Sequence, residues 1–337
     1  MQLYKDMPVL VTGCAGFIGF HVCKRLCEEG FFVRGVDNFN SYYDVKLKIK
    51  RESYLRNNYP QNFVSCHRLD LSDEYETQLY FSKNCRDIGY IIHLAAQAGV
   101  RHSFEAPLAY IDSNVVAFSN VLRACNSYCE ELMHFVFASS SSVYGANEII
   151  PFSIEDKTNK PLSIYGATKI FDESLAFVYA KNFKMLCTGL RFFTVYGPWG
   201  RPDMAYFQFA KNILDGIGIE VYNMGDMSRD FTYIDDIVDG VYLALGTLPI
   251  NGNAPYQVYN LGSSSPVSLI RFIEILEENI GKRAIIKYTP AVACGDLKTT
   301  YADISESAEF LGFAPKVRIE EGLRIFVEWY KKYREEA

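Results

Sequence analysis

The feature that most constrains the fold is a glycine-rich turn between an apolar strand and a helix. Residues 9–12 read Val-Leu-Val-Thr, and glycines follow at positions 13, 16 and 19. Glycines at this spacing let the backbone turn sharply, so that free N–H groups at a helix N-terminus can approach a pyrophosphate. The segment predicts the start of a dinucleotide-binding fold. The expected cofactor contacts in it are Gly13, Gly16, Phe17, Ile18 and Gly19.

An acidic residue at the end of the next predicted strand supports this interpretation. Asp37 lies 18 residues after Gly19, about where a carboxylate can accept hydrogen bonds from both hydroxyls of an adenosine ribose. A carboxylate here would repel a 2′-phosphate, so we expect NAD rather than NADP. Further cofactor contacts are expected from residues that follow the predicted strands, namely Asn38, Asp70, Leu71, Leu94, Ala95 and Ala96.

The first half of the chain alternates short β-branched runs with helical stretches, which is typical of a parallel sheet covered on both faces. We predict an α/β fold, a doubly wound parallel Rossmann sheet with a smaller α/β substrate-binding lobe. The expected domains are 1–197 and 198–337, with a possible crossing between them around 225–262. The expected strands are Pro8–Thr12, Phe32–Asp37, Phe63–His67, Tyr90–Ala95, His134–Ser139, Leu186–Phe192, Ile219–Tyr222, Val258–Leu261 and Ile285–Tyr288. The expected helices include Phe17–Glu29, Ala205–Leu214, Ser268–Ile280 and Glu320–Tyr333.

Composition excludes several classes of partner. The net charge is −6, so no broad basic field exists to gather nucleic acid. No apolar run approaches the roughly 20 residues needed to cross a bilayer, and the chain enters its first predicted strand with no room for a signal peptide. The nine cysteines and five histidines show no metal-binding spacing. We therefore expect a cytoplasmic protein with no nucleic-acid partner, no membrane partner and no metal.

A tyrosine–lysine pair follows a serine-rich strand end. Residues 138–145 read Ala-Ser-Ser-Ser-Ser-Val-Tyr-Gly, and Tyr165 and Lys169 lie four residues apart in a helix predicted after Pro161. At this spacing both side chains share one helix face. A phenol with a pKa of about 10 is a poor base at neutral pH, and a nearby ammonium stabilises its phenolate. The pair is common on ordinary helices, but after a dinucleotide-binding turn it favours a hydride-transfer site.

Together these motifs resemble those of the extended short-chain dehydrogenase/reductases, over nearly the whole chain. Within that group the chain resembles the nucleotide-sugar 4-epimerases, and most closely their UDP-glucuronate branch. Three segments carry this second resemblance: 36–44 (Val-Asp-Asn-Phe-Asn-Ser-Tyr-Tyr-Asp), 93–101 (His-Leu-Ala-Ala-Gln-Ala-Gly-Val-Arg) and 191–204 (Arg-Phe-Phe-Thr-Val-Tyr-Gly-Pro-Trp-Gly-Arg-Pro-Asp-Met).

The resemblance implies roles for the catalytic residues. Tyr165 would be the base, and Lys169 would be its electrostatic partner and hold the nicotinamide ribose. Ser140 and Ser142 would form hydrogen bonds near the sugar O4, and Asn114 would approach the cofactor site.

The resemblance also implies the substrate contacts. Thr194 and Arg201 would hold a sugar carboxylate, since UDP-galactose epimerases usually have asparagine in place of the threonine. Hexose epimerases often have an arginine where this chain has Ala293, which puts a second phosphate contact in doubt. The remaining contacts would be Arg101 on the substrate, Arg229 on the diphosphate, Asp296 on the uridine ribose, and Val221 and Tyr222 beside the uracil.

The implied reaction is the reversible C4 epimerisation of UDP-glucuronate to UDP-galacturonate through a 4-keto intermediate. The net redox change is zero, so NAD is expected to stay tightly bound and to be recycled. Four alternatives remain: a 4-epimerase of a neutral UDP-hexose or N-acetylhexosamine, a UDP-glucuronate decarboxylase, a 4,6-dehydratase and a non-enzymatic NAD-binding regulator. Thr194 and Arg201 argue against the first. Ser141-Ser142 stands where a dehydratase usually has Asp-Glu.

Two apolar segments bear on the oligomeric state. Val115–Cys125 and Ile170–Tyr179 are rich in apolar residues, and the family commonly pairs the equivalent helices in a dimer. Burial of the same residues against the parent sheet is the alternative. We expect a homodimer.

Overall fold

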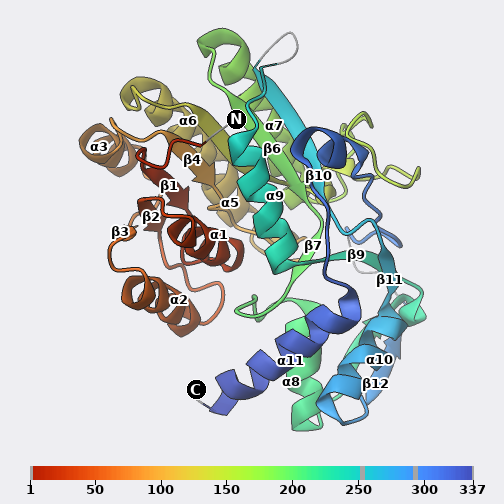
Figure 1. The fold of residues 1–337 in the computed structure, drawn as a ribbon. Coiled ribbons are helices and arrows are strands. Elements are labelled where there is room, and N and C mark those ends of the chain that lie inside the picture. Colours follow the sequence, from red (N-terminus) through yellow and green to blue (C-terminus); the bar gives the residue numbers. More distant parts are fainter. Residues whose placement is uncertain (1–2, 251–254, 291–294, 336–337) are drawn as a thin grey trace.

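The fold is built around a seven-stranded parallel sheet (Figure 1). The computed structural model describes residues 3–250, 255–290 and 295–335. The strand order is β10-β6-β5-β4-β1-β2-β3, so the direction of winding reverses between β1 and β4. Such a reversal leaves a crevice at the carboxyl ends of the strands, where ligands bind. The strands are β1 (Val9–Thr12), β2 (Val33–Asp37), β3 (Phe63–Arg68), β4 (Tyr90–His93), β5 (His134–Ser140), β6 (Cys187–Phe192) and β10 (Tyr256–Leu261).

Helices cover both faces of this sheet. On one face α1 packs against α2 and α9, and on the other face α6 packs against α3 and α7. A π-helical turn, Ile111–Val116, leads into α6, and a 3-10 turn, Ser141–Tyr144, follows β5. The helices are α1 (Phe17–Glu28), α2 (Val45–Asn58), α3 (Glu74–Asn84), α4 (His102–Glu105), α5 (Pro107–Tyr110), α6 (Ala117–Tyr128), α7 (Ile164–Phe183) and α9 (Ile234–Gly246).

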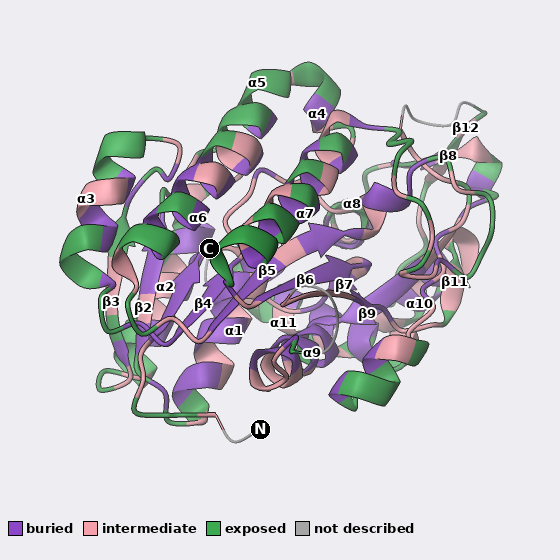
Figure 2. Cartoon of the chain, turned by 90° about the horizontal axis from the view of Figure 1, so that it is seen from above, coloured by how far each residue is buried: buried purple, intermediate pink, exposed green. Residues whose placement is uncertain are grey.

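The two covered faces explain the continuous apolar strands. Val9 and Val11 belong to the core under α1 and α9, whereas Leu10 belongs to the core under α6 and α7. Successive side chains of a strand point to opposite faces, so a strand buried on both sides is apolar at most of its positions. Figure 2 shows this arrangement as buried strands between helices whose outer faces are exposed.

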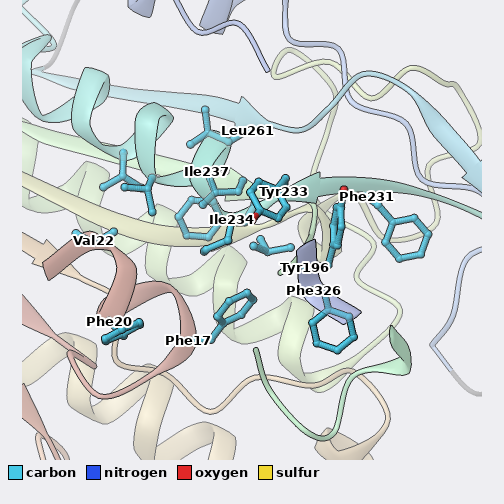
Figure 3. Packing of buried hydrophobic residues seen from close by; sticks show 14 of the residues in the cluster. Phe17, Phe20, Val22, Tyr196, Phe231, Tyr233, Ile234, Ile237, Leu261 and Phe326 are labelled. Carbon is cyan, nitrogen blue, oxygen red and sulfur yellow. The ribbon is translucent and has the colours of Figure 1, made fainter. Parts of the chain in front are cut away.

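A smaller lobe follows the sheet and lies below it in Figure 1. It contains the small sheets β11-β9-β7 and β12-β8, and its core is continuous with the core beneath α1. Figure 3 shows Phe17 and Phe20 of α1 in the same cluster as Tyr196 and Phe326. The elements are β7 (Thr194–Tyr196), α8 (Ala205–Asp215), β8 (Ile219–Tyr222), β9 (Ser228–Tyr233), β11 (Pro266–Ser268), α10 (Leu269–Ile280), β12 (Ile286–Thr289) and α11 (Ile319–Glu335).

The predicted α/β fold is confirmed, and every expected strand is present with ends shifted by at most a few residues. The short strands β7, β9 and β11 were not expected. Strand β10 follows residue 197 in the sequence but pairs with β6 in the large sheet. The predicted domain boundary at residue 197 stays a prediction. No helix in the described ranges is long and apolar enough to span a membrane.

Candidate active site

A cavity of about 1030 Å³ lies at the carboxyl ends of the parallel strands and extends to the smaller lobe. It reaches the upper end of the range common for ligand sites, roughly 300–1,000 Å³. Residues of the glycine turn, the serine strand end, α7 and the lobe all line it. The structure therefore brings together nearly all of the predicted site residues, the exceptions being Asn114 and Val221.

The glycine turn has no room for side chains. Gly13 has φ +70°, and a Cβ on it would lie 2.8 Å from the Ala95 backbone nitrogen. A Cβ on Gly19 would lie 2.0 Å from the Gly13 carbonyl oxygen. Helix α1 begins at Phe17 with no side-chain cap, so its first N–H groups remain for an anion. The turn fits the pyrophosphate of a dinucleotide.

Asp37 at the end of β2 both lines the cavity and holds the turn in place. Its carboxylate accepts hydrogen bonds from the backbone N–H of Ala15 at 3.1 Å and of Phe39 at 2.8 Å. Each carboxylate oxygen can accept more than one hydrogen bond, so Asp37 keeps capacity for ribose hydroxyls. The predicted ribose contact is thus compatible with the observed geometry.

Helix α7 carries the tyrosine–lysine pair. Its N-cap Ser163 accepts a hydrogen bond from the Gly166 N–H at 3.0 Å, which places Tyr165 in the first turn. The Lys169 ammonium donates to the Ala138 carbonyl at 2.9 Å and to Asp172 at 3.0 Å. Burial lowers the pKa of Lys169, but Asp172 and Tyr165 more than offset this, so the pKa is raised and the ammonium stays charged.

The predicted serines lie at the tip of β5. Ser140 accepts a hydrogen bond from the Ser142 N–H at 3.1 Å, and its hydroxyl donates to the Ser142 hydroxyl at 3.2 Å. Both side chains line the cavity on the same strand end as Ala138. They can therefore present hydroxyls to a substrate oxygen beside the tyrosine–lysine pair.

A buried hydrogen-bond network lies behind the serines, and the sequence did not predict it. Arg191 donates to both oxygens of Glu173, at 2.8 and 2.9 Å, and to the Tyr144 hydroxyl at 3.0 Å. Ser139 donates to the same Glu173 at 2.5 Å. The network joins β5, β6 and α7, and so fixes α7 relative to the strand that carries the serines.

The predicted carboxylate contacts also line the cavity, but Arg201 already has an acidic partner. Its guanidinium donates through Nε to Asp203 at 3.1 Å and through Nη2 to the second oxygen of Asp203 at 2.5 Å. The Tyr42 hydroxyl donates to Asp203 at 3.2 Å. Burial and the Asp203 charge raise the pKa of Tyr42 to about 12. Asp203 therefore occupies the Nε–Nη2 edge of the guanidinium, and Nη1 keeps N–H groups that a substrate carboxylate could use.

At the lobe end of the cavity, Arg101 connects the loop after β4 with the C-terminal part of the chain. It donates to Asp296 at 2.7 Å, and its guanidinium lies 4.3 Å from the centre of the Tyr222 ring. Arg229 also lines the cavity, and burial lowers the pKa of its guanidinium. Ala293, the position of the expected departure, lies outside the described residues.

Two of the predicted site residues do not line the cavity. Asn114 is buried behind the cavity, where it bridges the Gln97 backbone and the Thr168 hydroxyl. Its side chain therefore connects the loop after β4 to α7. The Val221 side chain is fully buried in the core, because alternation along β8 points Val221 inward and leaves Tyr222 at the cavity.

The glycine turn, the acid after β2 and the tyrosine–lysine pair in one cavity define an enzyme of the short-chain dehydrogenase/reductase type. Residues 9–262 match the model of the NAD dependent epimerase/dehydratase family. The chain belongs to this family. In residues 3–250, 255–290 and 295–335, no group of three or more acidic, histidine or cysteine side chains could hold a metal ion.

Named relatives cover nearly the whole chain. A probable UDP-glucuronate 4-epimerase from Rhizobium meliloti is 42% identical over 344 residues, covering 97% of this chain and 98% of the relative. The crystal structure of UDP-glucuronic acid 4-epimerase from Bacillus cereus, in complex with UDP-glucuronic acid and NAD, matches with a TM-score of 0.87 and 34% identity, covering 97% of this chain and all of that one. A Thermotoga maritima UDP-glucose 4-epimerase matches with a TM-score of 0.84 and 30% identity, with the same coverage.

Proposed function

We propose that the chain is an NAD-dependent UDP-glucuronate 4-epimerase that interconverts UDP-glucuronate and UDP-galacturonate. The observation that carries the proposal is that Thr194 and Arg201 line the same cavity as Tyr165 and Lys169. A guanidinium is suited to a carboxylate because its planar fork donates two parallel hydrogen bonds. The named relatives from Rhizobium meliloti and Bacillus cereus support the same substrate.

The cofactor would lie along the glycine turn and Asp37, with Lys169 holding the nicotinamide ribose. When bound, NAD supplies the acceptor, and afterwards the donor, of the hydride at sugar C4. The side chain of Tyr165 takes the O4 proton as the ketone forms and returns it when the opposite face is reduced. Lys169 stabilises the phenolate, and Ser140 and Ser142 hold O4. Between the two steps the keto sugar rotates about its diphosphate linkage and presents its other face.

The Arg201–Asp203 ion pair is also compatible with a second class of substrate, a neutral UDP-hexose. Because Asp203 already neutralises the guanidinium, a neutral hexose would not leave a buried charge unpaired in this cavity. The relative from Thermotoga maritima, a UDP-glucose 4-epimerase, has a comparable fold. A neutral UDP-hexose is therefore the second candidate substrate.

We further propose that the protein forms a homodimer and is located in the cytoplasm. Phe171, Phe177 and Val178 on α7, and Val116 just before α6, are at least 36% exposed. Pairing these helices with a second copy would bury the exposed apolar side chains, which supports a homodimer. The described cysteines are all free thiols, which supports a reducing compartment such as the cytoplasm.

One experiment separates the candidate reactions. The purified protein is incubated with UDP-glucuronate without added cofactor, and the nucleotide sugars are identified by chromatography and mass spectrometry. The proposal predicts UDP-galacturonate as the product. A UDP-pentose with release of carbon dioxide would indicate a decarboxylase instead. Turnover of UDP-glucose without turnover of UDP-glucuronate would indicate the neutral-sugar enzyme.

A further inference from the structure

A buried carboxylate lies directly behind the lysine of the tyrosine–lysine pair. Asp172 follows Lys169 by three residues on α7, and its Oδ2 accepts a hydrogen bond from the lysine ammonium at 3.0 Å. The side chains of Lys169 and Asp172 are 2% and 1% exposed. The second oxygen, Oδ1, is buried and has no hydrogen-bond partner among the described residues. Asp172 is therefore held in place chiefly by its contact with Lys169.

The neighbouring Glu173 shows how a structural carboxylate is satisfied in this fold. Both of its oxygens accept hydrogen bonds from Arg191, and one also accepts from Ser139. A buried charge with incomplete partners costs stability, whereas a fully hydrogen-bonded one costs less. The incomplete bonding of Asp172 indicates a role other than strengthening the fold.

The charges around the pair leave Asp172 as the group that balances Lys169. Glu173 is neutralised by Arg191. His93 on β4 is neutral, because burial and the Lys169 charge lower its pKa to about 3. Burial raises the pKa of Asp172 to about 7 against the opposing effect of the Lys169 charge, so Asp172 balances Lys169 fully only above neutral pH. The titratable groups that interact directly with the pair are Tyr165 and Glu173 on α7 and His93 on β4. Arg191 and Tyr256 interact with Glu173, and Tyr110 interacts with Tyr165.

We infer that Asp172 is a positioning residue that sets both the place and the effective charge of Lys169, and so the pH range in which Tyr165 and Lys169 work together. The Ala138 carbonyl and Asp172 hold two of the three ammonium N–H groups, which leaves one for a ligand in the cavity. The inference rests on the proposed function, since it assigns Asp172 to the proposed tyrosine–lysine chemistry.

The direction of the effect follows from electrostatics. A negative charge favours the protonated form of every group near it. Without the Asp172 charge, the ammonium would stabilise a Tyr165 phenolate more strongly, and Lys169 itself would lose its proton more easily. Both changes move the pH range of activity toward lower values.

The test compares wild type with Asp172→Asn, which keeps the size of the side chain and removes its charge. The pH profile of kcat for UDP-glucuronate epimerisation is expected to move to lower pH by about half to one unit, most on the alkaline limb, where Asp172 of the wild type is charged. Asp172→Glu, which keeps the charge, is expected to move the profile less. A stable Asp172→Asn variant with an unchanged profile, or with a shift to higher pH, would overturn the inference. Asp172→Ser replaces it if the asparagine variant does not fold.

A second readout needs no turnover. The folded-state pKa of Asp172 lies above its unfolded value, so its contribution to stability is complete below the unfolded pKa and is lost as the pH rises through about 7. The melting temperature of the wild type is expected to fall relative to that of Asp172→Asn between about pH 4 and pH 7. A constant difference would contradict the raised pKa of Asp172. If the wild type does not epimerise UDP-glucuronate, the proposed function fails, and this melting comparison still tests the Lys169–Asp172 pair.

Discussion

Asp203 accepts two hydrogen bonds from the Arg201 guanidinium, one from Nε and one from Nη2, and so occupies one edge of it. Tyr42, from the segment after β2, donates to the same Asp203. Arg201, Asp203 and Tyr42 therefore form a hydrogen-bonded network at the cavity wall. An acidic substrate could bind the remaining N–H groups of Nη1 or displace Asp203, whereas a neutral one can leave the network intact.

Arg201→Ala is expected to weaken UDP-glucuronate binding more than UDP-glucose binding. Only the uronate has a carboxylate that would contact the Arg201 guanidinium, so only the uronate loses this contact. The difference should be about 1.5–3 kcal/mol, or about 10- to 150-fold in Kd. Asp203→Asn is the matched control. It frees the guanidinium, and should therefore change the preference in the opposite direction, toward the uronate. Equal losses for both sugars in Arg201→Ala would point to a diphosphate contact.

Thr194→Ala is expected to let a fraction of turnovers end in decarboxylation. Once C4 is a ketone, the uronate is a β-keto acid, and carbon dioxide leaves fastest when the C5–carboxylate bond is perpendicular to the carbonyl plane. The Thr194 hydroxyl and Arg201 would restrict that alignment by fixing the carboxylate. Mass spectrometry should detect a UDP-4-keto-pentose, and absorbance should show NADH left on the enzyme. Products identical to those of the wild type would contradict a protective role.

Tyr165→Phe is expected to abolish epimerisation and to leave UDP binding close to that of the wild type. The substitution removes only the hydroxyl that we propose exchanges the O4 proton, and the loss should be at least about 100-fold in kcat. Tyr110→Phe is a useful control, because its ring packs edge-on against Tyr165 at 6.1 Å while its hydroxyl donates to backbone carbonyls. Near-normal turnover of Tyr165→Phe would exclude this residue as the base.

Asp37→Ala is expected to weaken NAD binding and to reduce discrimination against NADP. The change removes an acceptor for the ribose hydroxyls and a charge that repels a 2′-phosphate. Titration of both cofactors measures the ratio of their dissociation constants. Asp70→Ala removes a second acid that lines the cavity and should leave that ratio nearly unchanged. An unaltered ratio in Asp37→Ala would show that the ribose is bound elsewhere.

Acid is expected to destabilise the fold through two buried histidines. Burial lowers the pKa of His93 to about 3 and that of His134 to about 4, whereas an unfolded histidine titrates at about 6.5. Their contribution is complete above about pH 6.5 and is lost as the pH falls toward 4, by about 1.4 kcal/mol per pH unit for each. Denaturant unfolding at pH 7 and pH 5 measures the change. His134→Asn should reduce the pH dependence, and His67→Asn, at an exposed position, should not.

Local patterns in the sequence determined the parallel sheet, the glycine turn and the tyrosine–lysine pair. Each depends on backbone conformation over a few residues: Gly13 and Gly19 leave no space for a Cβ, and Tyr165 and Lys169 are one helical turn apart. The residues of such features occur at fixed spacing along the chain, so a single sequence is enough to identify them.

Only the tertiary structure decided what the side chains contact. Asn114 lies in the π-helical turn before α6, and packing turns its amide toward Gln97 and Thr168 instead of the cavity. Tyr42 reaches Asp203 across 161 residues, and Arg191 pairs with Glu173 between a strand and a helix. These contacts depend on how distant elements pack and on which face a side chain occupies. A sequence pattern fixes the spacing of residues along one element, whereas the partners of a side chain are set by the elements that pack against it.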